Sequence, residues 1–123
     1  MSVESYRDLR VWQTGMDIAE RCYRLTRKFP KSEAFGLTSQ INRASSRIPA
    51  NIAESYGRAS RKEYLQFVRI ANGSLKELET HLILSVRVGI SDQAEVDEIL
   101  ELCAEEGRML LNLMRSLDMP FPA

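Results

Sequence analysis

The sequence contains few of the side chains that catalysis and metal binding most often require. Its 123 residues include one histidine, His81, and two cysteines, Cys22 and Cys103. A single histidine excludes the paired Glu-x-x-His motifs that hold two iron ions in helical bundles, and the chain has no glycine-rich phosphate loop. The sequence therefore predicts no catalytic residue, no metal site and no cofactor. We expect a protein that is not an enzyme, with His81 at the surface or partly packed beside Glu77.

Long apolar runs and a charged-then-apolar leader pattern are also missing. No stretch approaches the length that crosses a membrane, and the first residues do not have the pattern of a signal peptide. Cys22 and Cys103 are far apart and fall on expected apolar helix faces, which favours buried, reduced thiols over a disulfide framework. These features predict a cytoplasmic protein with no membrane partner.

Neither sign of charge is in excess, because 17 lysines and arginines balance 17 acidic residues. Residues 1–69, however, hold 13 basic and 7 acidic residues, whereas residues 70–123 hold 4 and 10, so the two parts carry +6 and −6. We expect two charged surface patches, which could attract one subunit to the next head to tail. A strongly basic nucleic-acid binder would have a different balance.

Helical periodicity, in contrast, is abundant. Apolar residues recur at spacings of three and four, which predicts amphipathic helices over residues 8–29, 33–56, 61–88 and 92–117. Pro30 ends the first segment, and Ser60 with Glu63 forms a capping-box pattern at the start of the third. Gly107, on the apolar seam of the fourth, indicates that another helix approaches closely there. The first helix is expected to bury Leu9, Trp12, Met16, Ala19 and Tyr23, together with Val11, Ile18, Cys22, Leu25 and Phe29.

Two of these helices contain residues that often interrupt a helix. Pro49 lies within the second, whose stripe nevertheless continues on both sides through Leu37, Ile41, Ala44, Ile48, Ile52 and Tyr56. Asn72-Gly73 is a turn signal that could split the third helix, although its stripe is unbroken too. Short connections between long amphipathic helices predict one domain over residues 1–123, an all-α, up-down-up-down antiparallel four-helix bundle.

The third helix has a line of basic residues away from its apolar stripe, formed by Lys62, Arg69, Lys76 and Arg87. Such a line could follow a phosphate backbone by neutralising its charge without reading its sequence. It could equally be an ordinary solvated face, since lysine and arginine favour helices. No aromatic residues interleave the line as a platform for stacked bases would require. The four residues are therefore candidates for nucleic-acid binding, with RNA and DNA both open.

Further candidates concern contacts between subunits. A mixed-charge line on the second helix, Gln40, Arg43, Arg47, Asn51 and Glu54, is typical of a subunit contact or an internal polar network. Two apolar strips lie offset from the expected core, formed by Ile70, Leu84 and Val88 and by Leu102, Met109 and Leu113. An isolated bundle would leave these strips in water, so we expect them to be buried in a homo-oligomer.

Several segments together resemble the small bacterial four-helix proteins first noticed as products of intervening sequences in large-subunit ribosomal RNA genes. The segments are Leu9–Trp12, Met16–Ala19, Tyr23–Pro30, Arg43–Arg58 and Ile70–Thr80. Ser55 departs from the pattern, because the family motif reads Asn-Ile-Ala-Glu-Gly at that point.

The resemblance implies a ring-like homo-oligomer, a pentamer in its barrel-like family form. It also implies similarity to the accessory protein of diversity-generating retroelements, which works with a reverse transcriptase and nucleic acid. We therefore expect a non-catalytic oligomeric adaptor that associates with nucleic acid, and that has a reverse-transcriptase-like or other protein as a further candidate partner. The alternative is a protein scaffold that binds no nucleic acid.

Overall fold

The computed structural model describes residues 4–118, and most of them are helical. The long helices are α1 (Arg10–Thr26), α2 (Leu37–Tyr56), α3 (Arg61–Arg87) and α4 (Gln93–Asp118). Two short 3-10 helices, η1 (Tyr6–Asp8) and η2 (Lys31–Glu33), precede α1 and α2. No strand occurs within residues 4–118. The expectation of an all-α protein with four long helices is confirmed.

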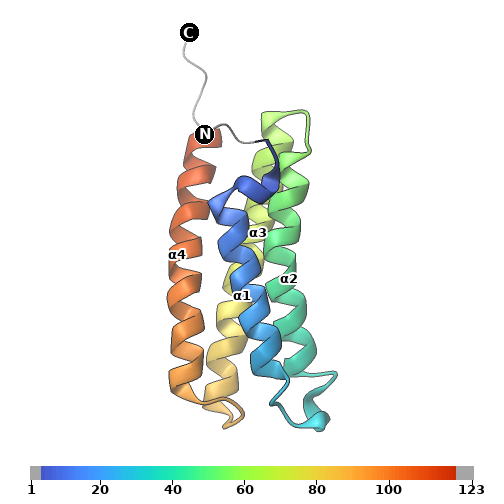
Figure 1. Cartoon of the computed structure of the whole chain (residues 1–123), viewed down its shortest axis with the longest axis vertical. Coiled ribbons are helices and arrows are strands. Elements are labelled where there is room, and N and C mark those ends of the chain that lie inside the picture. The colour runs from blue at the N-terminus through green and yellow to red at the C-terminus, as the bar shows by residue number, and fades with distance from the viewer. Residues whose placement is uncertain (1–3, 119–123) are drawn as a thin grey trace.

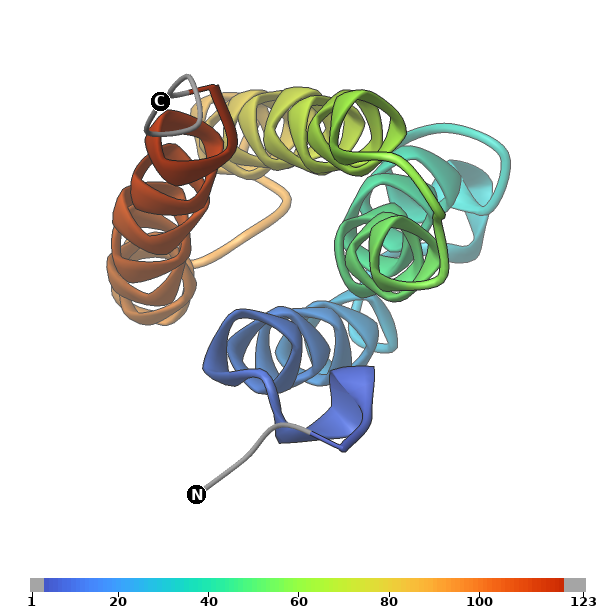
Figure 2. The same ribbon diagram turned by 90° about the horizontal axis from the view of Figure 1, so that it is seen from above.

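The four helices run alternately in opposite directions along the long axis (Figure 1). Seen from above, they form the corners of a square in which α3 lies diagonally across from α1 (Figure 2). Each helix packs against two neighbours, so that α1 contacts α2 and α4, and α3 contacts the same two helices. The outer face of α3 is therefore on the opposite side of the molecule from α1.

Two helix boundaries differ by three or more residues from those predicted. The first helix ends at Thr26, because Lys28 and Phe29 donate their backbone N–H groups to carbonyls only three residues back, which tightens the chain into a turn. The second begins at Leu37, because η2 and Gly36 precede it. The Glu33 carboxylate accepts a hydrogen bond from the backbone N–H of Leu37 at 3.2 Å and so satisfies a donor in the first turn.

The helix-interrupting residues do not interrupt their helices. Asn72-Gly73 lies inside the continuous α3, so the split of this helix is excluded. Pro49 lies inside α2 with its ring buried, and the apolar residues of α2 on both sides of it are in the core. The Ser60 hydroxyl accepts a hydrogen bond from the backbone N–H of Glu63 at 3.1 Å, as expected of a residue that caps α3.

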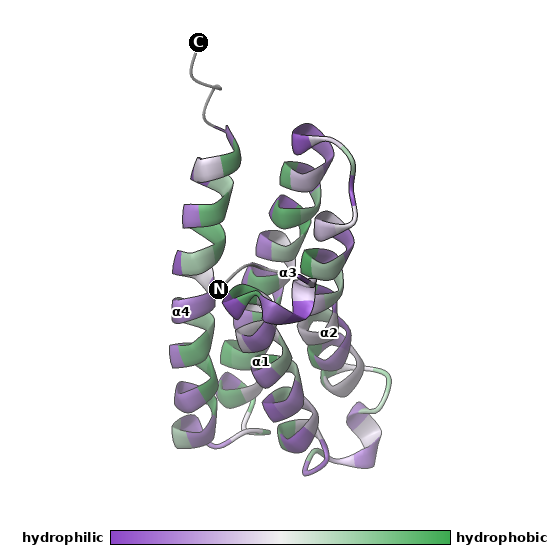
Figure 3. Ribbon diagram, turned by 45° about the horizontal axis from the view of Figure 1, so that its top comes forward, coloured by the Kyte–Doolittle hydropathy of each residue, from purple (hydrophilic) through white to green (hydrophobic). Residues whose placement is uncertain are grey.

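Apolar side chains face the inside of the bundle, and α4 shows the division between an apolar inner and a polar outer side most clearly (Figure 3). The core face of α1 differs from the stripe predicted first. Met16 and Tyr23 are each 45% exposed, whereas Thr14 and Gly15 are buried. The predicted stripe therefore placed the centre of the face wrongly, because it left out Thr14 and Gly15.

Gly107 also differs from its prediction. A Cβ atom at this position would meet only Leu75 Cδ2, at 3.5 Å, which is an ordinary van der Waals contact. Close packing of helices therefore does not require a glycine there. A Cβ at Gly15 would instead lie 2.9 Å from the Glu106 carboxylate, so the close approach is at α1.

Candidate nucleic-acid interface

The basic line is displayed on the outer surface of α3. Its four members, Lys62, Arg69, Lys76 and Arg87, are all exposed. Arg69 lies 3.9 Å from Asp118 and Lys76 lies 3.1 Å from Glu79, and the two basic side chains remain 61% and 64% exposed. Ion pairs this exposed are weak and exchange readily with solvent. The line therefore stays available to a ligand.

A residue of α4 joins the line where α3 and α4 meet. Arg108 and Lys76 line one groove between these helices, which we call the α3–α4 groove. Its remaining lining residues are Asn72, Ala104, Gly107 and Leu111. The sequence prediction missed Arg108, because the periodicity of α3 alone cannot show which residues of another helix lie beside it.

A second groove occurs near the first turns of α3. It is lined by Lys62, Leu65, Gln66, Arg69 and Ile70. The structure thus brings two predicted nucleic-acid candidates together with Ile70, a predicted subunit contact. The same surface has the chemistry for a phosphate backbone and for an apolar neighbour.

The mixed-charge line of α2 does not form a connected network. The Asn51 amide donates to the Arg47 carbonyl at 2.7 Å, and Glu54 pairs with Arg58, which lies just after the end of α2. Arg43 and Arg47 are exposed and make no ion pair with any acid within residues 4–118. A role of this line in subunit contact stays a prediction.

The two apolar strips differ in how much of each the bundle covers. Ile70, Leu84 and Val88 are 39%, 42% and 55% exposed. Leu102, Met109 and Leu113 are instead half-buried against the bundle's own core. The expectation that an isolated bundle leaves both strips in water is therefore wrong for α4, because neighbouring helices cover much of its strip.

The charge asymmetry of the chain is partly neutralised at the edge where α1 meets α4. Arg10 pairs with Glu105 at 2.9 Å, Arg21 with Glu98 at 3.9 Å, and Lys28 with Glu95. These are basic residues of the first part of the sequence paired with acids of the second. The expected separation into two free patches is thus too simple, because antiparallel packing brings the two signs together.

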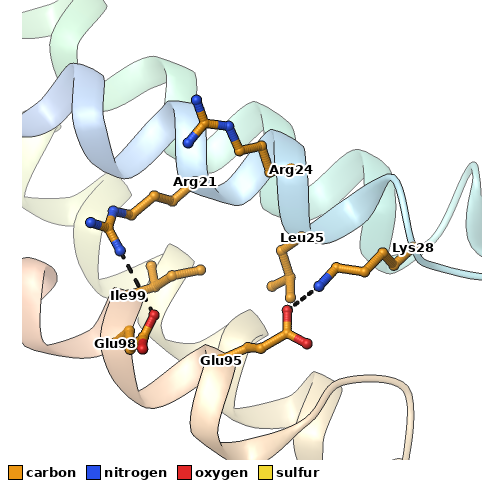
Figure 4. A pocket seen from close by; sticks show the side chains of 7 residues that line it. All are labelled: Arg21, Arg24, Leu25, Lys28, Glu95, Glu98 and Ile99. Carbon is orange, nitrogen blue, oxygen red and sulfur yellow. Dashed lines mark hydrogen bonds and ion pairs between the residues drawn. The ribbon is translucent and has the colours of Figure 1, made fainter.

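These ion pairs border a cleft between α1 and α4 (Figure 4). Leu25 and Ile99, both buried, form its apolar part. Arg24 points away from the acids of α4 and pairs with Glu20 on its own helix. Each basic residue of the cleft already has an acidic partner, so the cleft suits an anionic ligand less well than the α3–α4 groove does.

Glu106 is the residue that sequence reasoning missed most completely. Its side chain is fully buried, and neither carboxylate oxygen has a hydrogen-bond partner. Loss of solvation raises the pKa of the Glu106 carboxyl to about 8, and the charge of Glu105 adds to the rise. Its position in the sequence could have indicated this burial. Glu106 lies three residues after Cys103 and four before Leu110, and so falls on the apolar seam of the helix.

The remaining reactive side chains do not form a site. His81 Nε2 is 3.7 Å from Glu77 Oε1, in accord with the expected pairing. Cys22 and Cys103 are free and buried as predicted, and burial raises the pKa of the Cys22 thiol to about 12, so it stays protonated.

Within residues 4–118, no three His, Cys, Asp or Glu residues gather closely enough to hold a metal ion. No helix in that range is both long and apolar enough to span a membrane.

The structure thus defines an all-α protein of four long helices with a basic outer face on α3. Residues 7–112 match the 23S rRNA-intervening sequence protein family, and the chain belongs to that family. The resemblance found in the sequence motifs is confirmed.

A solved structure has the same fold. It is described as a protein of unknown function from the S23 ribosomal protein family of Bacteroides thetaiotaomicron. It is 24% identical to this chain, with a TM-score of 0.80 over 85% of this chain and 98% of its own. At this identity the likeness shows the fold alone. No curated protein matches the chain.

Proposed function

We propose that this protein is a non-catalytic binding protein that assembles with copies of itself and associates with the backbone of a nucleic acid. The observation that carries the proposal is the basic outer face, which we define as Lys62, Arg69, Lys76 and Arg87 of α3 with Arg108 of α4. All five side chains are exposed. Cations in such a row neutralise phosphates and release their counterions, which gives binding that weakens as salt rises.

The face favours backbone contact over recognition of base sequence. Most of its polar groups are cations, which suit phosphate oxygens. No aromatic residue of α3 lies within the basic line to stack on unpaired bases. RNA and DNA should therefore bind through the same residues with little preference for sequence.

Assembly would strengthen this binding. The exposed apolar strip of Ile70, Leu84 and Val88 has no cover within residues 4–118. Its burial against another copy would repeat the basic face around a ring, with five copies in the form that the family resemblance implies. Repeated charge raises the local field and the rate at which an anionic partner arrives.

A protein scaffold without nucleic-acid binding is the second candidate. The observation that favours it is that Ile70 lines the same groove as two cations of the basic face, near the start of α3. A neighbouring copy or another protein, such as a reverse-transcriptase-like partner, would bury Ile70 and pair acids with Lys62 and Arg69. The basic face would then be an interface between proteins.

Charge reversal separates these two functions. Arg69→Glu with Lys76→Glu should abolish retention of labelled RNA and DNA without changing oligomer mass, as measured by fluorescence anisotropy and by light scattering after gel filtration. The charge-matched control is Arg27→Glu with Lys31→Glu, two exposed residues at the opposite end of the bundle from the start of α3. Full retention by the double variant of α3 would reject the nucleic-acid function and leave the scaffold.

A further inference from the structure

The α3–α4 groove has basic walls and a floor that small residues keep open. Lys76 and Asn72 come from α3, and Arg108 faces them from α4. Ala104 and Gly107, two of the α4 residues that line the groove, have almost no side chain to fill the space. Gly107 is not required for helix packing, as its contact with Leu75 shows. Because Gly107 has no side chain, it leaves space in the groove that a ligand can occupy.

The donors of the groove are chemically different and complementary. A guanidinium group offers a planar fork of N–H donors that matches two oxygens of a phosphate, whereas an ammonium group is a compact charge with freely rotating donors. An asparagine amide adds a neutral N–H donor. Together Arg108, Lys76 and Asn72 can surround one tetrahedral anion from two helices.

The electrostatics of the groove also favour an anion. Arg108 makes no ion pair with an acid in the described part of the chain, and the only pair there that involves Lys76 is the exposed one with Glu79. Two positive side chains therefore line the groove, and no acidic residue is among its lining residues. This excess of positive charge distinguishes the α3–α4 groove from the cleft between α1 and α4, where acids of α4 pair with Arg21 and Lys28.

We propose that the α3–α4 groove binds a phosphodiester group of a nucleic-acid backbone, held by Arg108, Lys76 and Asn72. The inference rests on the proposed function and assigns to this groove the strongest phosphate contact of the basic face. The half-exposed Leu111 offers an apolar surface to the adjoining sugar. The neighbouring cation Arg69, two turns earlier on α3, then contacts a further phosphate of the same strand.

The test measures anisotropy of fluorescein-labelled single-stranded RNA and DNA of one sequence across a salt series. Arg108→Ala should weaken binding about tenfold, as expected for a lost charged hydrogen bond. It should also lower the slope of log affinity against log salt by about 0.7 for a single strand. Ala104→Glu places a carboxylate in the groove without removing a cation and should weaken binding at least as much.

The control is Arg27→Ala, which removes the same charge from an exposed position at the end of α1. If Arg108→Ala and Ala104→Glu bind like this control while the unchanged protein binds, the groove assignment is overturned and the proposed function stands. If the unchanged protein binds neither oligonucleotide at low salt, the proposed function itself fails. Circular dichroism of each variant verifies that the helices are intact.

Competition separates a backbone phosphate from a free one. Inorganic phosphate is added to the protein–oligonucleotide complex at constant ionic strength, with chloride as the reference anion. Equal effects of the two anions support a phosphodiester as the ligand. Displacement by phosphate alone, lost in Ala104→Glu, would identify the groove as a site for free phosphate and overturn the backbone assignment.

Discussion

Glu106 lies at a position where helical bundles usually have an apolar side chain. Its carboxyl group is fully buried against Gly15 of α1, which also lies close to Ile48 and Pro49 of α2. An ionised carboxylate without partners would be very costly in this environment. The neutral acid is the form that the folded protein accommodates, which is why the pKa of Glu106 rises to about 8.

This shift predicts that stability depends on pH in a definite direction. The pKa of Glu106 is raised from 4.5 to about 8 on folding, so the folded protein binds the proton more tightly than the unfolded chain. The stabilisation is full below pH 4.5, declines as pH rises, and is lost above about 8. Each unit of the shift corresponds to about 1.4 kcal/mol.

Glu106→Gln should remove most of this pH dependence, because the amide has nearly the same shape and does not ionise. Urea denaturation at about pH 5 and about pH 9, at one protein concentration, measures the effect. The unfolding free energy of the unchanged protein should fall by several kcal/mol between these values. Equal declines in the variant and the unchanged protein would show that other groups are responsible.

Gly15 and Gly73 provide a matched pair at the residue scale. A Cβ at Gly15 would come within 2.9 Å of Glu106 Oε2 and 3.4 Å of Ile48 Cγ2, whereas a Cβ at Gly73 would meet nothing within 4 Å. Gly15→Ala should therefore destabilise the protein by about 1–3 kcal/mol through overpacking. Gly73→Ala should stabilise it by up to about 1 kcal/mol, because alanine favours helices. Thermal denaturation compares the two, and an equal gain in both would contradict the close contact at Gly15.

At the scale of whole elements, Arg61 links the start of α3 to the end of α4. Its guanidinium donates hydrogen bonds to the Ser116 carbonyl at 2.7 Å and to the Leu117 carbonyl. The last carbonyls of a helix have no partner within the helix, and the negative end of its dipole favours a cation. Arg61 therefore satisfies the last turn of α4 from a neighbouring helix.

Removal of Arg61 should loosen that turn in particular. Arg61→Ala is expected to cost about 1–3 kcal/mol and to speed amide hydrogen exchange in the last turn of α4. Arg115→Ala is the control, because it removes an exposed cation from the same turn without removing hydrogen bonds from α3. Identical exchange in the two variants would contradict the role of Arg61.

The sequence predicted which helices form more accurately than where each helix begins and ends. The apolar periodicity located all four helices. It also correctly predicted that the second and third helices continue through Pro49 and Asn72-Gly73, because a continuous apolar face outweighs one unfavourable residue. It did not locate the start of α2, since that depends on Glu33 reaching back to a backbone N–H. It also misjudged the face of α1, where burial of Gly15 follows from a neighbouring helix.

At the scale of the whole molecule, the exposed strip of α3 should determine assembly. Leu84 is 42% exposed, and Val88, about one turn further along the chain, is 55% exposed. Leu84→Lys should lower the mass measured by light scattering while leaving the helical content unchanged, because a buried ammonium without a partner is costly at an interface. Met16→Lys is the matched control on α1, where Met16 is 45% exposed. A mass of one chain before any substitution would reject the assembly.

The candidate site shows the same limit of sequence reasoning. Lys62, Arg69, Lys76 and Arg87 were identified because they lie on one helix, where spacing alone determines the face. Arg108 required knowledge of how α4 packs against α3, and Glu106 required knowledge that a charged residue type is buried. Both depend on contacts between helices, which a single sequence does not show.

The edge between α1 and α4 has a consequence for the order in which the bundle forms. Among the long helices, these are the only packed neighbours that no direct connection joins, so their contact closes the longest loop of the chain. The pairs Arg10–Glu105, Arg21–Glu98 and Lys28–Glu95 that bridge this edge are largely exposed. Docking of α4 on α1 should therefore be a late event in folding, after the hairpins α1–α2 and α3–α4 have formed. Substitutions at these pairs would then accelerate unfolding and leave the folding rate nearly unchanged.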